Sequence, residues 1–203
     1  MMTESKDIVV EVIVWDGSKE TDNPYGHVTT KIIKNGIPYS YSLENSSDPH
    51  VVCNTEAFNL LEKKEQSLRS GVGFFLNISQ EQAKDIFMSM QTRFHGYNKP
   101  SCIYHTLSTN CTYAIQQSIQ KAGIDLYASN KGITRYPASV EHGLLNTRNN
   151  NAWLVKKIIQ YPKGQDKGID VKADQVQLIF GVNAILADDG WHSLGDYNLS
   201  ENW

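Results

Sequence analysis

The residue whose setting best suits chemistry is Cys111, one of three cysteines in the chain. Apolar residues follow it at helical spacing, with Ala114, Ile115 and Ile119 on one side and Gly123 as a stop signal. Unpaired amides and the macrodipole at a helix N-terminus favour a thiolate, and one such amide could hold a developing oxyanion. We therefore predict that Cys111 is a nucleophile. The competing interpretation is a small apolar residue buried in the first helical turn.

A thiolate needs a base or an ion-pair partner, and His27 is the best placed of the six histidines. It begins a β-branched run, 27–33, directly after Tyr25-Gly26, where the glycine allows a helix or a substrate to approach. A histidine at the start of a strand is more often structural when taken alone. Together with Cys111, it predicts a thiol and imidazole pair.

A third polar residue would orient the imidazole. The run that begins at His27 meets Asn35-Gly36, the dipeptide best suited to a tight hairpin, and a second strand returns over 37–43. In a two-residue hairpin, Ser40, Ser42 and Glu44 lie on the same sheet face as His27. The sequence leaves open which of the three serves.

The elements that must position these residues alternate irregularly between strands and helices, which indicates an α+β fold. Strands are predicted from β-branched and alternating runs at 8–15, 27–33, 37–43, 72–78, 153–161 and 171–185. Helices are predicted from apolar periodicity and stop signals at 56–68, 79–94, 111–122 and 137–145. The helix at 79–94 opens with a capping box formed by Ser79 and Gln82.

Composition limits the class of protein. The 203 residues are 40% hydrophobic, which suffices for one globular domain with a core. The net charge is −3 and the basic residues are scattered, so we expect no nucleic-acid partner. Three cysteines form no dense disulfide framework, and a reduced thiol is the simpler expectation. We also expect no signal peptide and no membrane span, hence synthesis in the cytoplasm and, if the protein is exported, a leaderless route.

Four short motifs carry a resemblance to a known group. They are Gly26-His27-Val28, Tyr39-Ser40-Tyr41-Ser42, Asn110-Cys111-Thr112 and Ala122-Gly123-Ile124. Over roughly residues 9–145 the chain resembles the circularly permuted NlpC/P60 group of papain-like thiol hydrolases. The resemblance implies a permuted papain-like α+β fold in which the histidine strand precedes the cysteine helix, and an antiparallel sheet packs against that helix. We accordingly expect a catalytic domain over 1–150 and a C-terminal extension over 151–203, with strands that complete the same domain.

The resemblance also implies roles for individual residues. Cys111 falls on the nucleophile position, His27 on the base position and Ser40 on the third polar position, where related enzymes often carry His, Asn or Gln. The expected reaction is attack of the thiolate on an amide carbonyl, followed by hydrolysis of the thioester, without a metal or cofactor. Similar bacterial proteins cleave peptidoglycan cross-links, and small members resemble antibacterial effectors of a type VI-like secretion machine. A cognate immunity protein and action in a target-cell periplasm are then expected.

Three alternatives stay open. Relatives of the same superfamily include isopeptidases or deamidases, and acyltransferases that act on host proteins or lipids. A second class is a papain-like binding module without activity. A zinc site is a third, because His95, Cys102, His105 and Cys111 are possible ligands, although Cys102 and His105 form only a single close pair.

Overall fold

A computed structural model of the 203-residue chain describes nine segments. They are residues 7–17, 26–42, 50–52, 63–97, 111–126, 137–165, 167–172, 186–187 and 190–191, without the side chains of 50–52, 94–97, 138, 186–187 and 190–191. The predicted Glu44, Cys53, Cys102 and His105 lie outside these segments, as does the side chain of His95.

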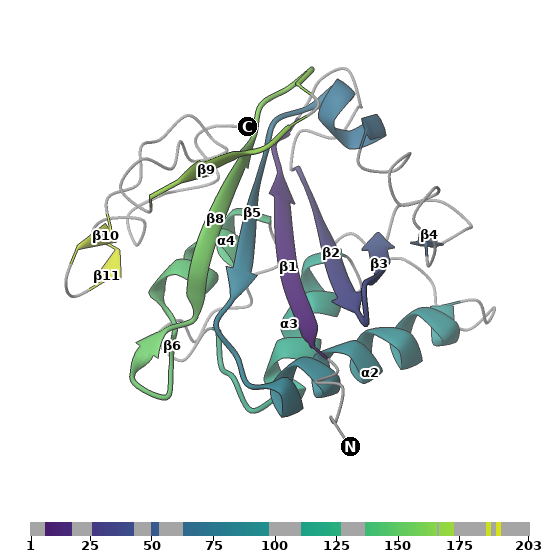
Figure 1. The fold of residues 1–203 in the computed structure, drawn as a ribbon, viewed down its shortest axis with the longest axis vertical. Helices are drawn as coiled ribbons and strands as arrows, with labels where there is room; N and C mark the ends of the chain where they lie inside the picture. Colours follow the sequence, from purple (N-terminus) through teal and green to yellow (C-terminus); the bar gives the residue numbers. More distant parts are fainter. Residues whose placement is uncertain are drawn as a thin grey trace.

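The fold is built on one seven-stranded sheet in which every neighbouring pair of strands is antiparallel (Figure 1). Its order is β4-β3-β2-β1-β5-β8-β9. The strands are β1 Ile8–Trp15, β2 His27–Lys34, β3 Ile37–Ser42, β4 His50–Val52, β5 Gly71–Leu76, β8 Val155–Tyr161 and β9 Ile169–Val171. Two small hairpins pair β6 Arg148–Asn149 with β7 Ala152–Trp153, and β10 Leu186–Ala187 with β11 Gly190–Trp191.

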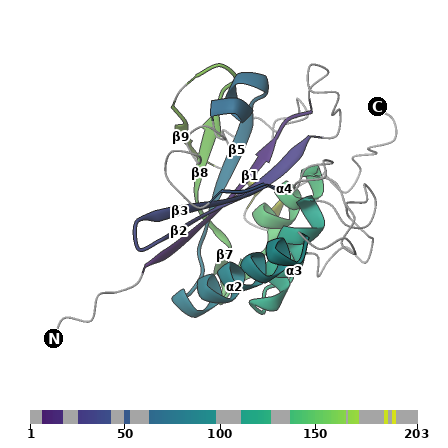
Figure 2. The same cartoon turned by 90° about the vertical axis from the view of Figure 1, so that its right-hand side faces the viewer.

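Three helices cover one face of this sheet (Figure 2). They are α2 Gln80–Tyr97, α3 Cys111–Lys121 and α4 Pro137–Asn146, and residues 63–68 are also helical. The capping box that opens α2 is confirmed, because Gln82 N–H donates to Ser79 Oγ and Ser79 N–H donates to Gln82 Oε1, both at 3.1 Å. The α+β class expected from the sequence is therefore observed. None of the helices in the described segments is long and apolar enough to cross a membrane.

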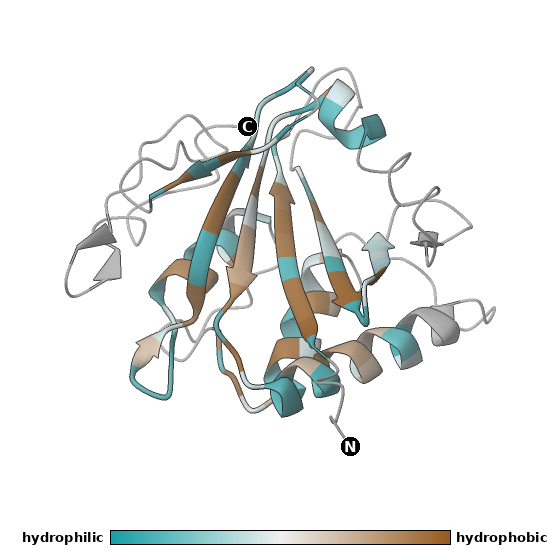
Figure 3. Ribbon diagram, viewed as in Figure 1, coloured by the Kyte–Doolittle hydropathy of each residue, from teal (hydrophilic) through white to brown (hydrophobic). Residues whose placement is uncertain are grey.

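The main core lies between the sheet and these helices. Val10, Val12 and Val14 of β1 point toward the helices and are almost completely buried, as are Ile115 and Ile119 of α3. Figure 3 shows the same distribution, with hydrophobic residues concentrated along the central strands. Burial of this apolar area is what holds α3, and with it Cys111, against β2.

The hairpin of β2 and β3 has the predicted two-residue turn. Asn35 and Gly36 both have positive φ, 53° and 76°, as a type I′ turn requires, and Lys34 pairs with Ile37. The register then pairs Lys31 with Ser40 and Thr29 with Ser42. Since side chains alternate along a strand, Ser40 and Ser42 lie on the same face as His27, as predicted.

The C-terminal part of the chain contributes strands to the same sheet. β8 pairs with β5, and β9 pairs with β8 at the sheet edge. The predicted strand at 171–185 corresponds to β9 only at its first residue, and 173–185 lie outside the described segments. The domain boundary predicted at residue 150 stays a prediction.

The second face of the sheet carries polar side chains that are also buried. Glu11 of β1 accepts a hydrogen bond of 2.6 Å from the Tyr161 hydroxyl and lies 3.8 Å from the Lys31 ammonium. Gly73 leaves room for this carboxylate, because a Cβ at that position would collide with Glu11 and approach the Tyr161 ring to 2.8 Å. The face on which His27 lies is thus ordered by hydrogen bonds and ion pairs as well as by apolar contacts.

Candidate functional site

Cys111 is the first residue of α3, as the sequence predicts, and its thiol is free and only 8% exposed. The start of α3 packs against the start of β2, where Val28 belongs to the same buried cluster as Cys111. The backbone amide of Val28 and the amides of Cys111 and Thr112 at the helix start lie close enough to the sulfur to stabilise a thiolate. The fold therefore brings Cys111 against Val28 on the helix-covered face of the sheet, whereas the side chain of His27, the residue before Val28, lies on the other face.

Burial affects the pKa of the Cys111 thiol more than the neighbouring backbone amides do. Removal from water raises the pKa of Cys111 above its usual value, and the amides of Val28, Thr112 and Cys111 offset only part of that rise. The expectation that the helix N-terminus would give Cys111 a lowered pKa is therefore wrong for the free protein. Cys111 is a neutral thiol at pH 7.

His27 begins β2 directly opposite Trp15 of β1 and is 6% exposed. Its Nε2 lies 2.8 Å from the Ser42 hydroxyl, on the neighbouring strand. Trp15 Nε1 in turn donates to the Thr29 hydroxyl at 2.9 Å, so the residues around the imidazole are held in place from both sides. Ser42 and His27 form a cross-strand diagonal pair that fixes the orientation of the ring.

The charge environment of His27 disfavours the imidazolium. Burial lowers the pKa of His27 to about 3, and the positive charges of Arg69 and Lys64 act in the same direction. Arg69 is itself buried, with Nε 3.1 Å from a Glu65 carboxylate oxygen and a 3.4 Å hydrogen bond from its guanidinium to the Asp16 carbonyl. The imidazole of His27 is therefore a free base at neutral pH.

The three predicted residues are not all joined by hydrogen bonds. Among the residues that the structure describes, no hydrogen bond links Cys111 to His27, and none links Ser40 to His27. Ser40 is buried two residues before Ser42 in β3, opposite Lys31. The hydrogen-bond partner of His27 is thus Ser42, which the sequence left as an alternative to Ser40.

Two carboxyl groups that the sequence did not single out lie at the same end of the sheet. Glu141 of α4 is 2% exposed, and among the residues that the structure describes its Oε1 has no hydrogen-bond partner. Burial, together with the nearby charge of Asp16, raises the pKa of Glu141 to about 8. Burial also raises the pKa of Asp16, which follows the last residue of β1, despite the opposing effects of the Gly17 amide and Arg69. No motif signals this pair, because its members meet only when α4 packs on β1.

The zinc ligands considered above are not brought together by the described segments. Of the four, only Cys111 has a described side chain. Within these segments no group of three or more His, Cys, Asp or Glu side chains could hold a metal ion.

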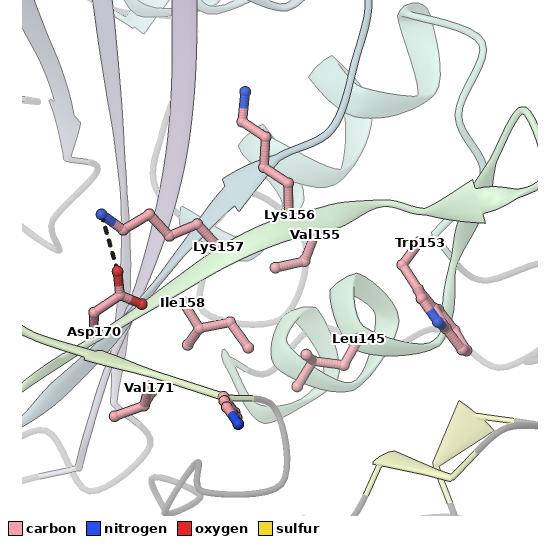
Figure 4. A pocket seen from close by; sticks show the side chains of 9 residues that line it. Leu145, Trp153, Val155, Lys156, Lys157, Ile158, Asp170 and Val171 are labelled. Carbon is pink, nitrogen blue, oxygen red and sulfur yellow. Dashed lines mark ion pairs between the residues drawn. The ribbon is translucent and has the colours of Figure 1, made fainter.

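A separate cavity of about 560 Å³ opens between β8, β9 and the end of α4 (Figure 4). Apolar side chains of Leu145, Val155, Ile158 and Val171 line it, and Trp153 stands at its rim. The Lys157 ammonium lies 3.2 Å from the Asp170 carboxylate beside it. None of the predicted site residues lines this cavity, so it is distinct from the region of Cys111 and His27.

Comparisons with known proteins bear on the fold. No family model matches the sequence, and no curated protein matches it. Among solved structures, the crystal structure of the type VI secretion system effector TseH superposes with a TM-score of 0.56 over 83% of this chain and 100% of that one. The two chains share a fold. Their sequence identity is 14%, so the likeness to TseH extends to the architecture and not to activity or residue roles.

Proposed function

We propose that this protein is a cysteine hydrolase that cleaves amide bonds, with Cys111 as nucleophile and His27 as base. The observation that carries the proposal is the placement of the thiol. Cys111 begins a helix whose amides, with that of Val28, favour the thiolate form, and Val28 directly follows a buried histidine. A thiol and preorganised amide donors are two of the parts that acyl transfer needs, and the third, a base, is proposed to be His27, whose side chain must turn from the other face of the sheet at the start of β2 to reach the sulfur.

Ser42 is proposed as the third member, in place of Ser40, because its hydroxyl lies 2.8 Å from His27 Nε2. A serine is a weak orienter, since it does not carry the charge that would stabilise an imidazolium. In the proposed reaction His27 accepts the thiol proton as sulfur attacks the carbonyl carbon, and returns it to the leaving amine. Water, deprotonated by His27, then hydrolyses the thioester.

We further propose that the substrate is the peptide cross-link of peptidoglycan and that the protein is a secreted antibacterial effector with a cognate immunity protein. Two observations support this. The motifs resemble permuted NlpC/P60 hydrolases, and the fold matches a protein described as a type VI secretion system effector. Isopeptidase, deamidase or acyltransferase activity on host proteins or lipids is the alternative within the same chemistry.

The test is digestion of purified Gram-negative sacculi, with released muropeptides identified by mass spectrometry. We expect the wild-type protein to release products with a new free amine, and Cys111→Ala and His27→Ala to release none. Lys121→Glu, a charge change at an exposed position near the end of α3, serves as the matched control and should act like wild type. Unchanged sacculi of several cell-wall types would contradict the substrate, and full activity of Cys111→Ala would contradict the mechanism.

A second candidate is a binding module without activity. The observation that favours it is that both Cys111 and His27 are buried and neutral, as packing residues would be. An electrophilic amide-directed probe that labels the wild-type protein at Cys111, and fails to label His27→Ala, would exclude this candidate.

A further inference from the structure

The hairpin of β8 and β9 is a basic region in an acidic chain. Residues 155–172 carry five lysines and two aspartates, a net charge of +3, whereas the whole chain has a net charge of −3. All five lysines are exposed, and they are Lys156, Lys157, Lys163, Lys167 and Lys172. The surface around this hairpin therefore favours acidic partners.

The strand β9 lies at the edge of the sheet. Within the described part of the chain it pairs with β8 on one side and with no strand on the other. Its first residue, Ile169, is 51% exposed. An edge strand of this kind is a template to which an extended segment can add by backbone hydrogen bonds.

The charges at the two ends of β9 select among such segments. Lys167 comes shortly before the strand and Lys172 directly after it. Two copies of this edge would bring lysines together, and like charges on neighbouring strands are destabilising. An acidic segment would instead meet opposite charges at both ends. The edge therefore fits an acidic segment better than a second copy of itself.

One face of β9 continues into the cavity between β8, β9 and α4. Val171 pairs with Ile158, and both line the cavity together with Leu145 (Figure 4). Ile169 lies on the same face as Val171 because side chains alternate along a strand. A strand added beside β9, about 5 Å away, would place every second side chain on this apolar face. Apolar side chains at alternate positions of the added segment fit there.

We propose that the outer edge of β9 binds an extended, acidic segment of a partner protein, which adds an eighth strand to the sheet. Its apolar side chains lie on the cavity face beside Ile169 and Val171, and its carboxylates lie near Lys167 and Lys172. The Lys157 ammonium keeps its ion pair with Asp170. None of the proposed catalytic residues lines this cavity, so the docking surface does not depend on the proposed hydrolase activity.

The first test measures the binding of fluorescent peptides to the full-length protein by anisotropy. The probe is a capped peptide of about seven residues that alternates glutamate with valine. One comparison peptide has lysine in place of glutamate, and the other has serine in place of valine. We expect the probe to bind at least about tenfold more tightly than either, because the first lacks the opposite charge and the second lacks the apolar contacts. Equal affinity of the probe and either comparison peptide overturns the proposal.

The second test changes the protein. Lys167→Glu combined with Lys172→Glu reverses the charge at both ends of β9, and we expect it to weaken binding of the probe at least about tenfold. The matched control, Lys84→Glu combined with Lys121→Glu, makes the same change in net charge at exposed positions of α2 and α3 and should keep the affinity within about threefold of wild type. Equal losses in the two double variants would show attraction by net charge alone and overturn the docking site.

Hydrogen exchange distinguishes an added strand from a loosely held peptide. We expect amide exchange over residues 169–171 to slow when the probe is bound, because backbone hydrogen bonds then form along the outer edge of β9. Binding of the probe without protection of 169–171 overturns the strand addition.

The protein itself also carries acidic residues that could occupy this edge. Carbodiimide joins carboxylates to neighbouring lysines, and the joined peptides are identified by mass spectrometry. In the full chain without peptide we expect no link from Lys156 or Lys167 to an acidic residue over 188–203. Such a link, within one chain or between two copies, would show that the protein covers this edge itself and would overturn the partner proposal.

Discussion

Substitution of Glu141 by glutamine should stabilise the protein, and more strongly at higher pH. Glu141 is buried, and its pKa is raised from 4.5 to about 8, first by burial and then by the charge of Asp16. Between these values the unfolded chain releases the proton while the folded chain retains it. The folded state therefore loses stability as pH rises from 4.5 toward 8, and glutamine, which keeps the shape and carries no titratable proton, removes that loss.

The magnitude follows from the two pKa values. A gap from 4.5 to about 8 corresponds to about 5 kcal/mol once both states have ionised. At pH 7 the same linkage gives a cost of about 3 kcal/mol, and at pH 5 a cost of about 1 kcal/mol. We therefore expect the stability gain of Glu141→Gln over wild type to increase by about 2–3 kcal/mol between pH 5 and pH 7.

The assay is urea unfolding of wild type and variant at both pH values, followed by circular dichroism. Comparison within each pH cancels the titration of all groups common to the two proteins, provided that they do not interact with Glu141. Asp16→Asn removes the charge that raises the pKa of Glu141 and should reduce the pH dependence. A gain that is the same at pH 5 and pH 7 would show that Glu141 ionises normally and would refute the reasoning.

Three further predictions concern the proposed catalytic residues. Ser42→Ala should lower kcat/KM for muropeptide release by about tenfold or more, because the hydrogen bond to His27 is lost. Ser40→Ala should change kcat/KM by less than about threefold, and a larger effect of Ser40→Ala than of Ser42→Ala would favour Ser40 as the third residue. Iodoacetamide should modify Cys111 slowly at pH 7 and faster at alkaline pH, since burial raises the pKa of its thiol, and rapid labelling at pH 6, read by mass spectrometry, would contradict this. Since the pKa of His27 is lowered to about 3, kcat/KM should show no acid limb between pH 5 and pH 7, and a half-point near 6.5 would indicate a solvated imidazole.

The parts of the fold that depend on local chemistry could be predicted from the sequence. The Asn35-Gly36 turn fixed the register of its hairpin, and this register placed both candidate serines on the face of His27. The choice between the serines could not be predicted. It depends on which hydroxyl lies diagonal to the imidazole after the sheet has twisted, and that hydroxyl belongs to Ser42.

Features that arise from packing were beyond the sequence. A helix N-terminus predicts a lowered thiol pKa, but the burial of Cys111 outweighs the amides that favour the thiolate. Glu141 lies in a ten-residue helix with no charge pattern of its own, and Asp16 is a turn residue in the sequence. Their pairing requires that α4 pack over the end of β1, which follows from the order of the sheet rather than from any motif.

The charge states of the candidate site constrain how it could work. A preformed thiolate and imidazolium pair requires a histidine that holds a proton at pH 7, and both burial and the cations Arg69 and Lys64 oppose this at His27. The proposed attack by Cys111 must then be coupled to proton transfer, with His27 as general base and the ion pair formed only as the sulfur bonds to the carbonyl carbon. Such a site reacts slowly with simple electrophiles and gains most from substrates whose binding positions the carbonyl well. The neutral thiol and the neutral imidazole are therefore consistent with a mechanism in which substrate binding, and not a preformed ion pair, makes the attack possible.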